Sequence, residues 1–263
     1  MQAMRAKRSL TLVRIKRFLG AVLLSASAVL AQAVGETHAR SNDAPGASRR
    51  APAIVIGLAG GMVRHDNRVH GVVQFAERLR RDFPEGVYVQ VFENRRWQEA
   101  REEIERRLDA NQDGKLSEEE KQSARVVLYG HSWGASEILH LAGELGREGI
   151  PVLLTIQVDS VRKPGEDGTV VPVNVAEAIN FYQDDGWLHG RAEIRAADPA
   201  HTTILGNIRR EYKSAACPGY PWYNRWFTVP HCAIEIDPQV WEQAEALIRG
   251  RLQPTDASAS GQP

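Results

Sequence analysis

The sequence predicts a single α/β domain with a mostly parallel sheet and helices on both of its faces. Short apolar runs have the length and composition of buried strands, at 53–58, 87–92, 126–129, 152–158 and 179–182. Segments with apolar residues at helical spacing lie between them, at 70–81, 95–108 and 135–147. This alternation is typical of a parallel sheet that helices cover on both faces. A last helix is predicted over 238–249, with Asp237 as its N-cap and Gly250 just past its end.

The composition is that of an ordinary globular protein. The chain has 263 residues, of which 43% are hydrophobic and 25% are charged. These values exclude collagen-like, coiled-coil, low-complexity and multi-span membrane proteins. The length suffices for one large domain or two small ones. We place one domain at 53–250, because strand and helix patterns alternate across that range without an internal repeat.

Residues 1–33 have the features of a secretory signal peptide. Six basic residues and no acidic one lie within the first seventeen positions, an apolar stretch follows at 18–31, and Ala31-Gln32-Ala33 fits a cleavage site. The apolar stretch is too short to span a membrane comfortably. We therefore expect an exported protein, secreted or periplasmic, with no transmembrane span after cleavage; an uncleaved anchor is the alternative.

The remaining chain is acidic. Removing 1–33 leaves 27 basic and 33 acidic residues, a net charge of −6, which argues against a nucleic-acid partner. Residues 34–52 are polar and without periodicity, and we expect a flexible tether there. We expect 251–263 to be a disordered tail.

The pentapeptide Gly130-His131-Ser132-Trp133-Gly134 marks a candidate nucleophile. It directly follows the apolar run VVLY and directly precedes the predicted helix at 135–147. A serine between a strand and a helix in a G-x-S-x-G pattern is typical of a nucleophile held on a tight turn above a sheet edge. The glycines are required where a side chain would clash with the flanking elements. The alternative is a glycine-rich turn with an incidental serine.

With this motif the chain resembles the α/β-hydrolase superfamily, in particular its lipase and esterase branch, over about 53–250. The resemblance implies a serine, acid and histidine triad in that chain order and an acyl-enzyme mechanism. It also implies an oxyanion hole of two backbone N–H groups. One belongs to Trp133, and the other comes from the loop after the first strand, at Gly61 or Met62. A plain tight turn is the alternative for that loop.

The resemblance places the base in a loop before the last helix, which favours His231 in the segment 229–232, ahead of a short strand-like run. His201 is the rival, or else a residue of the pocket wall, whereas His131 and His140 are expected to face elsewhere. For the acid we favour Asp159, which ends the strand at 152–158. Asp184 and Asp185 stay open as alternatives, although Asp184-Asp185-Gly186 is typical of a turn.

A second motif lies at 109–120, just before the nucleophile strand. The segment DANQDGKLSEEE fits D-x-[DN]-x-[DN]-G-x₅-E throughout and resembles a single EF-hand loop. The resemblance implies a structural calcium ion that braces this strand. The expected ligands are Asp109, Asn111, Asp113, the Lys115 carbonyl, Ser117 and Glu120. Leu116 is the expected apolar anchor, and an acidic connector without metal is the alternative.

The sequence therefore predicts a secreted serine hydrolase that cleaves carboxylic esters or thioesters of small molecules or lipids through an acyl-enzyme on Ser132. An acyltransferase or a peptidase that uses the same serine is the alternative among enzymes. A calcium-dependent binding protein on an inactive hydrolase scaffold is the alternative outside them. Cys217 and Cys232 fit an oxidising compartment, either as a bridge that pins the His231 loop or as two free thiols.

Overall fold

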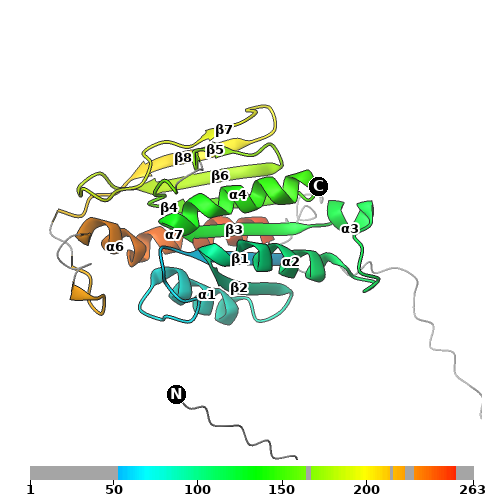
Figure 1. Ribbon diagram of the computed structural model, residues 1–263, viewed down its shortest axis with the longest axis horizontal. Coiled ribbons are helices and arrows are strands. Elements are labelled where there is room, and N and C mark those ends of the chain that lie inside the picture. Colours follow the sequence, from blue (N-terminus) through cyan, green and yellow to red (C-terminus); the bar gives the residue numbers. More distant parts are fainter. Residues whose placement is uncertain (1–52, 164–166, 214–215, 223–227, 253–263) are drawn as a thin grey trace, which may run out of the picture. The chain divides into compact units, whose positions relative to one another are not determined.

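A six-stranded sheet forms the centre of the structure, a computed structural model that describes residues 53–163, 167–213, 216–222 and 228–252 (Figure 1). All neighbouring strands are parallel, in the order β2-β1-β3-β4-β6-β8. These strands are β1 (Ala53–Ala59), β2 (Val87–Glu93), β3 (Arg125–His131), β4 (Val152–Val158), β6 (Val175–Tyr182) and β8 (Thr203–Arg209). Two short strands, β5 (Val170–Val171) and β7 (Arg195–Ala196), pair separately. The predicted signal peptide, tether and tail from 253 onward lie outside the described residues.

The helices follow the predicted alternation with the strands. They are α1 (Gly71–Asp82), the short 3₁₀ helix η1 (Asn94–Arg96), α2 (Trp97–Leu108), α3 (Glu118–Gln122), α4 (Trp133–Arg147), α6 (Val229–Glu235) and α7 (Pro238–Leu252). No helix within the described ranges is long and apolar enough to cross a membrane.

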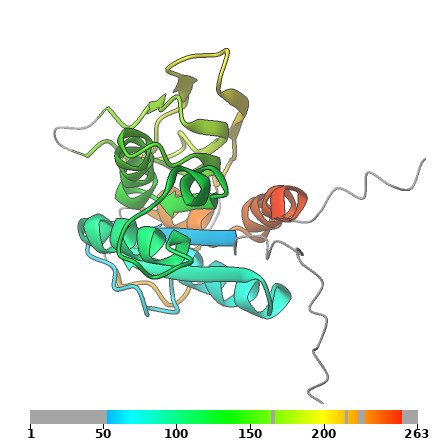
Figure 2. The same cartoon turned by 90° about the vertical axis from the view of Figure 1, so that its right-hand side faces the viewer.

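Helices cover both faces of the sheet, which confirms the predicted α/β class (Figure 2). On one face, α1 and α7 pack against the side chains that include Tyr129, and Phe75 of α1 makes ring contacts with Tyr129 and with Trp241 of α7. On the other face, Ile104 of α2 and Ile138 of α4 pack against the side chains that include Leu128. Successive residues of β3 thus serve opposite faces, as a strand buried on both sides requires.

The edge strand β8 is absent from the sequence prediction. Its seven residues, TILGNIR, are only partly buried, and a glycine and an asparagine interrupt the apolar pattern. An edge strand pairs on one side only, so its sequence needs less apolar character than a central strand. The five predicted strands are the more buried ones, and all five are present.

Two predictions near the C-terminal end of the domain are wrong. The sequence predicted a loop at 229–232 followed by a strand-like run. The structure instead has the helix α6 there, with Pro230 in its first turn, where proline is tolerated. The last helix does not end before Gly250 but continues to Leu252, whose side chain is 7% exposed. Burial of Leu252 against the sheet explains the extra turn, and residues 251 and 252 are therefore helical, not part of a tail.

The turn between β3 and α4 requires glycine on its helical side. A Cβ added at Gly134 would lie 2.1 Å from the carbonyl oxygen of Leu58, so α4 packs directly on the backbone of β1. Because β1, β3 and β4 are parallel neighbours, the segments that follow them meet at one edge of the sheet. Candidate site residues from all three lie at this edge.

Gly134→Ala is expected to lower the free energy of unfolding by about 1–3 kcal/mol, because the added methyl group meets a rigid backbone. Gly250→Ala is the matched control, since no atom lies within 4 Å of a Cβ added there. Helix propensity predicts a gain of about 0.5–1 kcal/mol for the control. Urea unfolding of both variants measures the difference, and equal effects would contradict the packing argument.

Candidate active site

Ser132 occupies the turn between β3 and α4 in a strained backbone conformation. Its φ of 58° and ψ of −125° lie in a region that residues other than glycine rarely adopt. Its backbone N–H donates to the carbonyl oxygen of Val158, at 3.0 Å, and so ties the turn to the end of β4. This conformation presents the Ser132 hydroxyl at the sheet edge, in the strand–turn–helix setting that the sequence predicts.

His231 lies between Ser132 and Asp159. Its Nε2 is 2.9 Å from Ser132 Oγ, and its Nδ1 is 2.7 Å from Asp159 Oδ2. A carboxylate only accepts hydrogen bonds, so Nδ1 carries the ring hydrogen and Nε2 is left to accept from the Ser132 hydroxyl. In this order, an imidazole can take the proton of a serine that attacks a carbonyl group.

Asp159 is fully buried, and its carboxylate is saturated with donors. Besides His231, it accepts hydrogen bonds from the backbone N–H of Gln183 at 3.2 Å, the side-chain amide of Gln183 at 2.7 Å and the N–H of Gly190 at 2.7 Å. Buried charges need such compensation to remain in a protein interior. The Asp159 carboxylate is therefore held in one position, facing His231.

The rival residues lie elsewhere. Asp184 is exposed and pairs with Arg209, and Asp185 accepts a hydrogen bond from the backbone N–H of Tyr212. His201 has a side chain that is 67% exposed and pairs with Asp198, so it is not part of the wall of the Ser132 pocket. Asp159 and His231 are thus the acid and the histidine that the structure brings to Ser132.

The loop after β1 lies beside Ser132. Gly60 approaches so closely that an added Cβ would lie 2.9 Å from the Ser132 Cβ, and Gly61 has a positive φ of 48°. The buried side chain of Asn94 donates to the carbonyl oxygens of Ala59 and Gly61, at 3.0 and 2.6 Å, and so fixes the loop. Trp133 opens α4, where the first N–H groups of a helix lack intrahelical acceptors. Gly61, Met62 and Trp133 line the same cavity as Ser132.

A cavity of about 670 Å³, which we call the Ser132 cavity, opens at these residues. Ser132, His231 and the loop at 60–63 line it, together with apolar side chains of Val69, Val161, Leu188 and Pro221. The volume is typical of a small-molecule site. Of the aromatic-rich segment at 221–227, the structure describes only Pro221 and Trp222, which is exposed; 223–227 lie outside the described residues.

His131 was expected to face away from the nucleophile, and this expectation is wrong. Its ring lines the Ser132 cavity, lies 4.5 Å from the His231 ring between centroids, and has its Nε2 3.1 Å from the His231 carbonyl oxygen. Strand alternation explains the direction, because His131 follows Tyr129 by two residues and shares its face of the sheet. Burial lowers the pKa of His131 to about 4, so the ring is neutral near pH 7.

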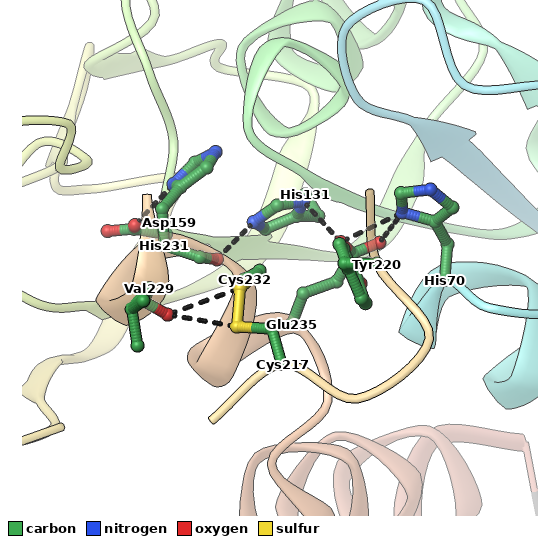
Figure 3. The surroundings of a disulfide bond; sticks show 9 residues. All are labelled: His70, His131, Asp159, Cys217, Tyr220, Val229, His231, Cys232 and Glu235. Atoms are coloured by element: carbon green, nitrogen blue, oxygen red, sulfur yellow. Dashed lines mark hydrogen bonds and ion pairs between the residues drawn. A yellow bond between two sulfur atoms is a disulfide. The ribbon is translucent and has the colours of Figure 1, made fainter. Parts of the chain in front are cut away.

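A second buried carboxylate, Glu235, lies next to His131 (Figure 3). Both of its oxygens are 3.1 Å from His70 Nδ1, and it accepts a hydrogen bond of 2.6 Å from the Tyr220 hydroxyl. Burial by itself raises the pKa of Glu235, but His131, His70 and Tyr220 together outweigh it and hold this pKa below its usual range. Glu235 is therefore ionised at neutral pH.

Cys217 and Cys232 form a disulfide, with their Cα atoms 6.0 Å apart (Figure 3). Cys232 directly follows His231 on α6, so the bridge joins this helix to the segment at 216–222. The sequence left the choice between a bridge and free thiols open, and the structure contains the bridge.

The segment at 109–120 forms a loop between α2 and α3 that leads directly into β3. Leu116 packs against the core, as expected of the anchor. Asp109 accepts from the backbone N–H groups of Asp113 and Gly114, and Glu120 accepts from those of Ala110 and Ser117. In the described part of the chain, no three His, Cys, Asp or Glu side chains converge as they would around a metal ion. The carboxylates are directed at the loop's own N–H groups.

A comparison with protein-family models finds no match, and neither does a comparison with curated proteins. Among solved structures, the chain is similar to RedJ with a polyethylene glycol molecule bound in its active site, at 12% identity and a TM-score of 0.35, over 71% of this chain and 90% of that one. It is also similar to P91, a dienelactone hydrolase-like promiscuous phosphotriesterase from metagenomic libraries, at 16% identity and a TM-score of 0.37, over 76% and 85%.

Several residues around the site escaped the sequence analysis. Gln183, Asn94 and Glu235 are polar residues whose partners lie far away in the chain, and sequence spacing gives no sign of such pairs. One available signal is that Gln183 directly follows β6, at the end of the strand where parallel sheets carry functional side chains. Glu235 gives a weaker signal, since it lies four residues after His231 and therefore on the same side of a helix.

Replacing Cys217 and Cys232 by serine is expected to lower the free energy of unfolding by about 3 kcal/mol. The reason is that the bridge closes the chain between these two residues into a loop and so restricts the unfolded state. Since α6 carries His231, activity towards the substrates tested below should fall along with stability. Urea unfolding and thiol titration of the denatured, unreduced protein provide the measurement. Two titratable thiols in the unmodified protein, or unchanged stability of the variant, would contradict the role of the bridge.

Proposed function

We propose that this protein is an exported serine hydrolase that cleaves carboxylic esters or thioesters through an acyl-enzyme on Ser132. The observation that carries the proposal is the hydrogen-bonded series from Ser132 Oγ through His231 to the fully buried Asp159, at the wall of a cavity of substrate size. The strained backbone of Ser132 supports it, since backbone strain is common at nucleophiles held on a strand–turn–helix.

In the proposed acylation step, Ser132 Oγ bonds to the carbonyl carbon of the ester and its proton passes to His231 Nε2. The negative charge that forms on the carbonyl oxygen is stabilised by backbone N–H groups of Trp133 and of Gly61 or Met62. Asp159 holds the ring in the required orientation and stabilises the imidazolium. When the carbon–oxygen or carbon–sulfur bond breaks, the Nε2 proton passes to the leaving alkoxide or thiolate.

In the proposed deacylation step, water enters the place of the departed alcohol or thiol. His231 Nε2 takes a proton from this water as its oxygen bonds to the acyl carbon, and then returns the proton to Ser132 Oγ as the acyl bond breaks. The products are a carboxylic acid and free enzyme. An alcohol or amine in place of water would yield acyl transfer, so the ratio of acid to transfer product decides between the two reactions.

The proposed export of the protein is supported by the disulfide, because such bridges persist in oxidising compartments. It is further supported by the arrangement of charge and apolar residues at 1–33. We propose a secreted or periplasmic location on these two grounds.

Ser132→Ala is expected to reduce turnover of p-nitrophenyl butyrate by at least about 10³-fold and to abolish labelling by a fluorophosphonate. Asp159→Asn should lower kcat by on the order of 10⁴-fold, because the ring of His231 loses its orienting acceptor. Asp184→Asn is the matched control and should stay within about twofold of the unmodified protein, since Asp184 is exposed and pairs with Arg209. Undiminished turnover of Ser132→Ala would refute the proposed mechanism.

We also propose that the loop at 109–120 binds a structural calcium ion. The donor set supports this, because the side chains of Asp109, Asn111, Asp113 and Glu120 offer the hard oxygen atoms that calcium prefers. Gly114, with a φ of 78°, allows the sharp bend of such a loop. To bind the ion, the carboxylates must exchange some of their hydrogen bonds with backbone N–H groups for contacts with calcium. The ion would brace the segment before β3 and take no part in the ester reaction.

Millimolar calcium is expected to raise the melting temperature relative to EGTA, since an ion at 100 times its Kd stabilises the folded state by about 2.7 kcal/mol. Glu120→Gln should remove this difference while retaining most of the helix cap, because glutamine also serves in a capping box. Glu118→Gln is the control at an exposed position of the same helix and should keep the difference. Identical melting curves in calcium and EGTA would mean that the loop is a connector without metal.

A further inference from the structure

The Ser132 cavity contains a second histidine–carboxylate pair that the proposed hydrolysis does not use. His70 lines this cavity, and its Nδ1 lies 3.1 Å from both oxygens of Glu235. The pair resembles that of His231 and Asp159 in its chemistry, since in both a buried carboxylate holds the Nδ1 side of an imidazole. It lies on the far side of Glu235 from His131 (Figure 3).

The His70 ring is fixed in place from several sides. Its edge meets the Tyr220 ring at a centroid distance of 4.8 Å, and the Tyr220 hydroxyl donates to the same carboxylate. The backbone beside it is tightly packed, because a Cβ added at Gly71 would lie 1.7 Å from the Glu235 carbonyl oxygen. The side chain nonetheless retains 12% exposure. It is therefore a rigid polar group with one accessible side.

The carboxylate determines which nitrogen of His70 is available to a ligand. Because the ionised Glu235 accepts hydrogen bonds only, the hydrogen of a singly protonated His70 ring lies on Nδ1, and Nε2 then keeps a lone pair. In Figure 3, Nε2 is the nitrogen that points away from Glu235. The cavity that His70 lines also has Val63, Val69 and Pro221 in its wall, together with the polar residues Arg64 and Asn67.

We infer that His70 is a substrate-binding residue, whose Nε2 accepts a hydrogen bond from a hydroxyl group of the ester. The inference rests on the proposed hydrolysis at Ser132 and adds the class of substrate, an ester with a hydroxyl group on its acyl or its alcohol part. A site built to bind such a hydroxyl disfavours the analogue that lacks it, because a buried polar group is then left without a partner. Glu235 is a positioning residue in this arrangement.

The test combines two pairs of esters with two histidine variants. Propyl butyrate and glyceryl 1-monobutyrate differ by hydroxyls on the alcohol part, and methyl hexanoate and methyl 6-hydroxyhexanoate differ by one on the acyl part. His70→Asn keeps an amide where Nδ1 was, able to donate to Glu235, and removes the acceptor at Nε2. His65→Asn is the matched control, because His65 also pairs with a glutamate, Glu93, but does not line the Ser132 cavity.

For at least one pair, the unmodified protein should have a kcat/KM about 3–10-fold higher for the hydroxylated ester, as one net hydrogen bond allows. His70→Asn should reduce this ratio to about 1 by lowering kcat/KM for the hydroxylated ester, whereas His65→Asn should keep the ratio. The pair that responds identifies the part of the ester that carries the hydroxyl. Ratios that are the same in the unmodified protein and in His70→Asn would overturn the inference.

A binding measurement on Ser132→Ala separates this inference from the proposed hydrolysis and does not depend on the folding of the His70 variant. The ¹⁵N signal of His70 Nε2 should shift on addition of the hydroxylated ester of at least one pair, and not on addition of its plain partner. This shift is expected even if the unmodified protein hydrolyses neither ester, an outcome that would refute the hydrolysis alone. Equal shifts with both esters, or none with either pair, would refute the hydroxyl site.

Discussion

A single buried charge, the carboxylate of Asp159, constrains much of the candidate active site. Such a charge is tolerated in a protein interior only while donors surround it. Its donors come from the end of β6, from Gly190 and from α6, so these segments must meet at the end of β4. The position of His231 is therefore set by the need of the buried Asp159 carboxylate for hydrogen-bond donors, because His231 is one of them. Site geometry and folded-state stability are coupled through this one group.

The helix α6 contains a second buried carboxylate under the same constraint, one helical turn after His231. It carries His231 and Glu235 four residues apart, and both side chains face buried polar partners instead of solvent. Seven residues are too few for a helix that is stable by itself. The helix is instead held by Asp159 at one side chain, by His70, His131 and Tyr220 at the other, and by the disulfide between them. Long-range polar contacts thus replace intrinsic helix stability at this position.

The features predicted from the sequence are those that local patterns encode. The alternation of apolar strands and amphipathic helices predicts the parallel sheet. The motif around Ser132 predicts a turn between a strand and a helix, and the structure has Ser132 in such a turn. His231 was favoured for its place before the last helix and Asp159 because it ends a strand, and the structure brings both to Ser132. The conformation of 229–235 was missed, because the long-range contacts that hold α6 leave no periodic signal in seven residues.

The polar surroundings of the site were missed for a related reason. Asn94 holds the loop after β1 across more than thirty residues, and Glu235 meets His70 across 165 residues. Each is an isolated polar residue in its own segment, and its burial depends on the finished packing. The direction of His131 was wrong because the strand was predicted to end at Tyr129, whereas β3 continues through His131 and fixes the face to which it points.

Because of the order of its residues along the chain, the site can be completed only late in synthesis. Ser132 precedes His231 by 99 residues, and all six strands of the sheet are complete before α6 begins. In a growing chain that has reached only β8, His231 has not yet been made, so Ser132 lacks this ring and Asp159 lacks its fourth donor. Any chemistry that needs the complete series is therefore absent from nascent and truncated chains, and competence arrives only with the last part of the domain to be made.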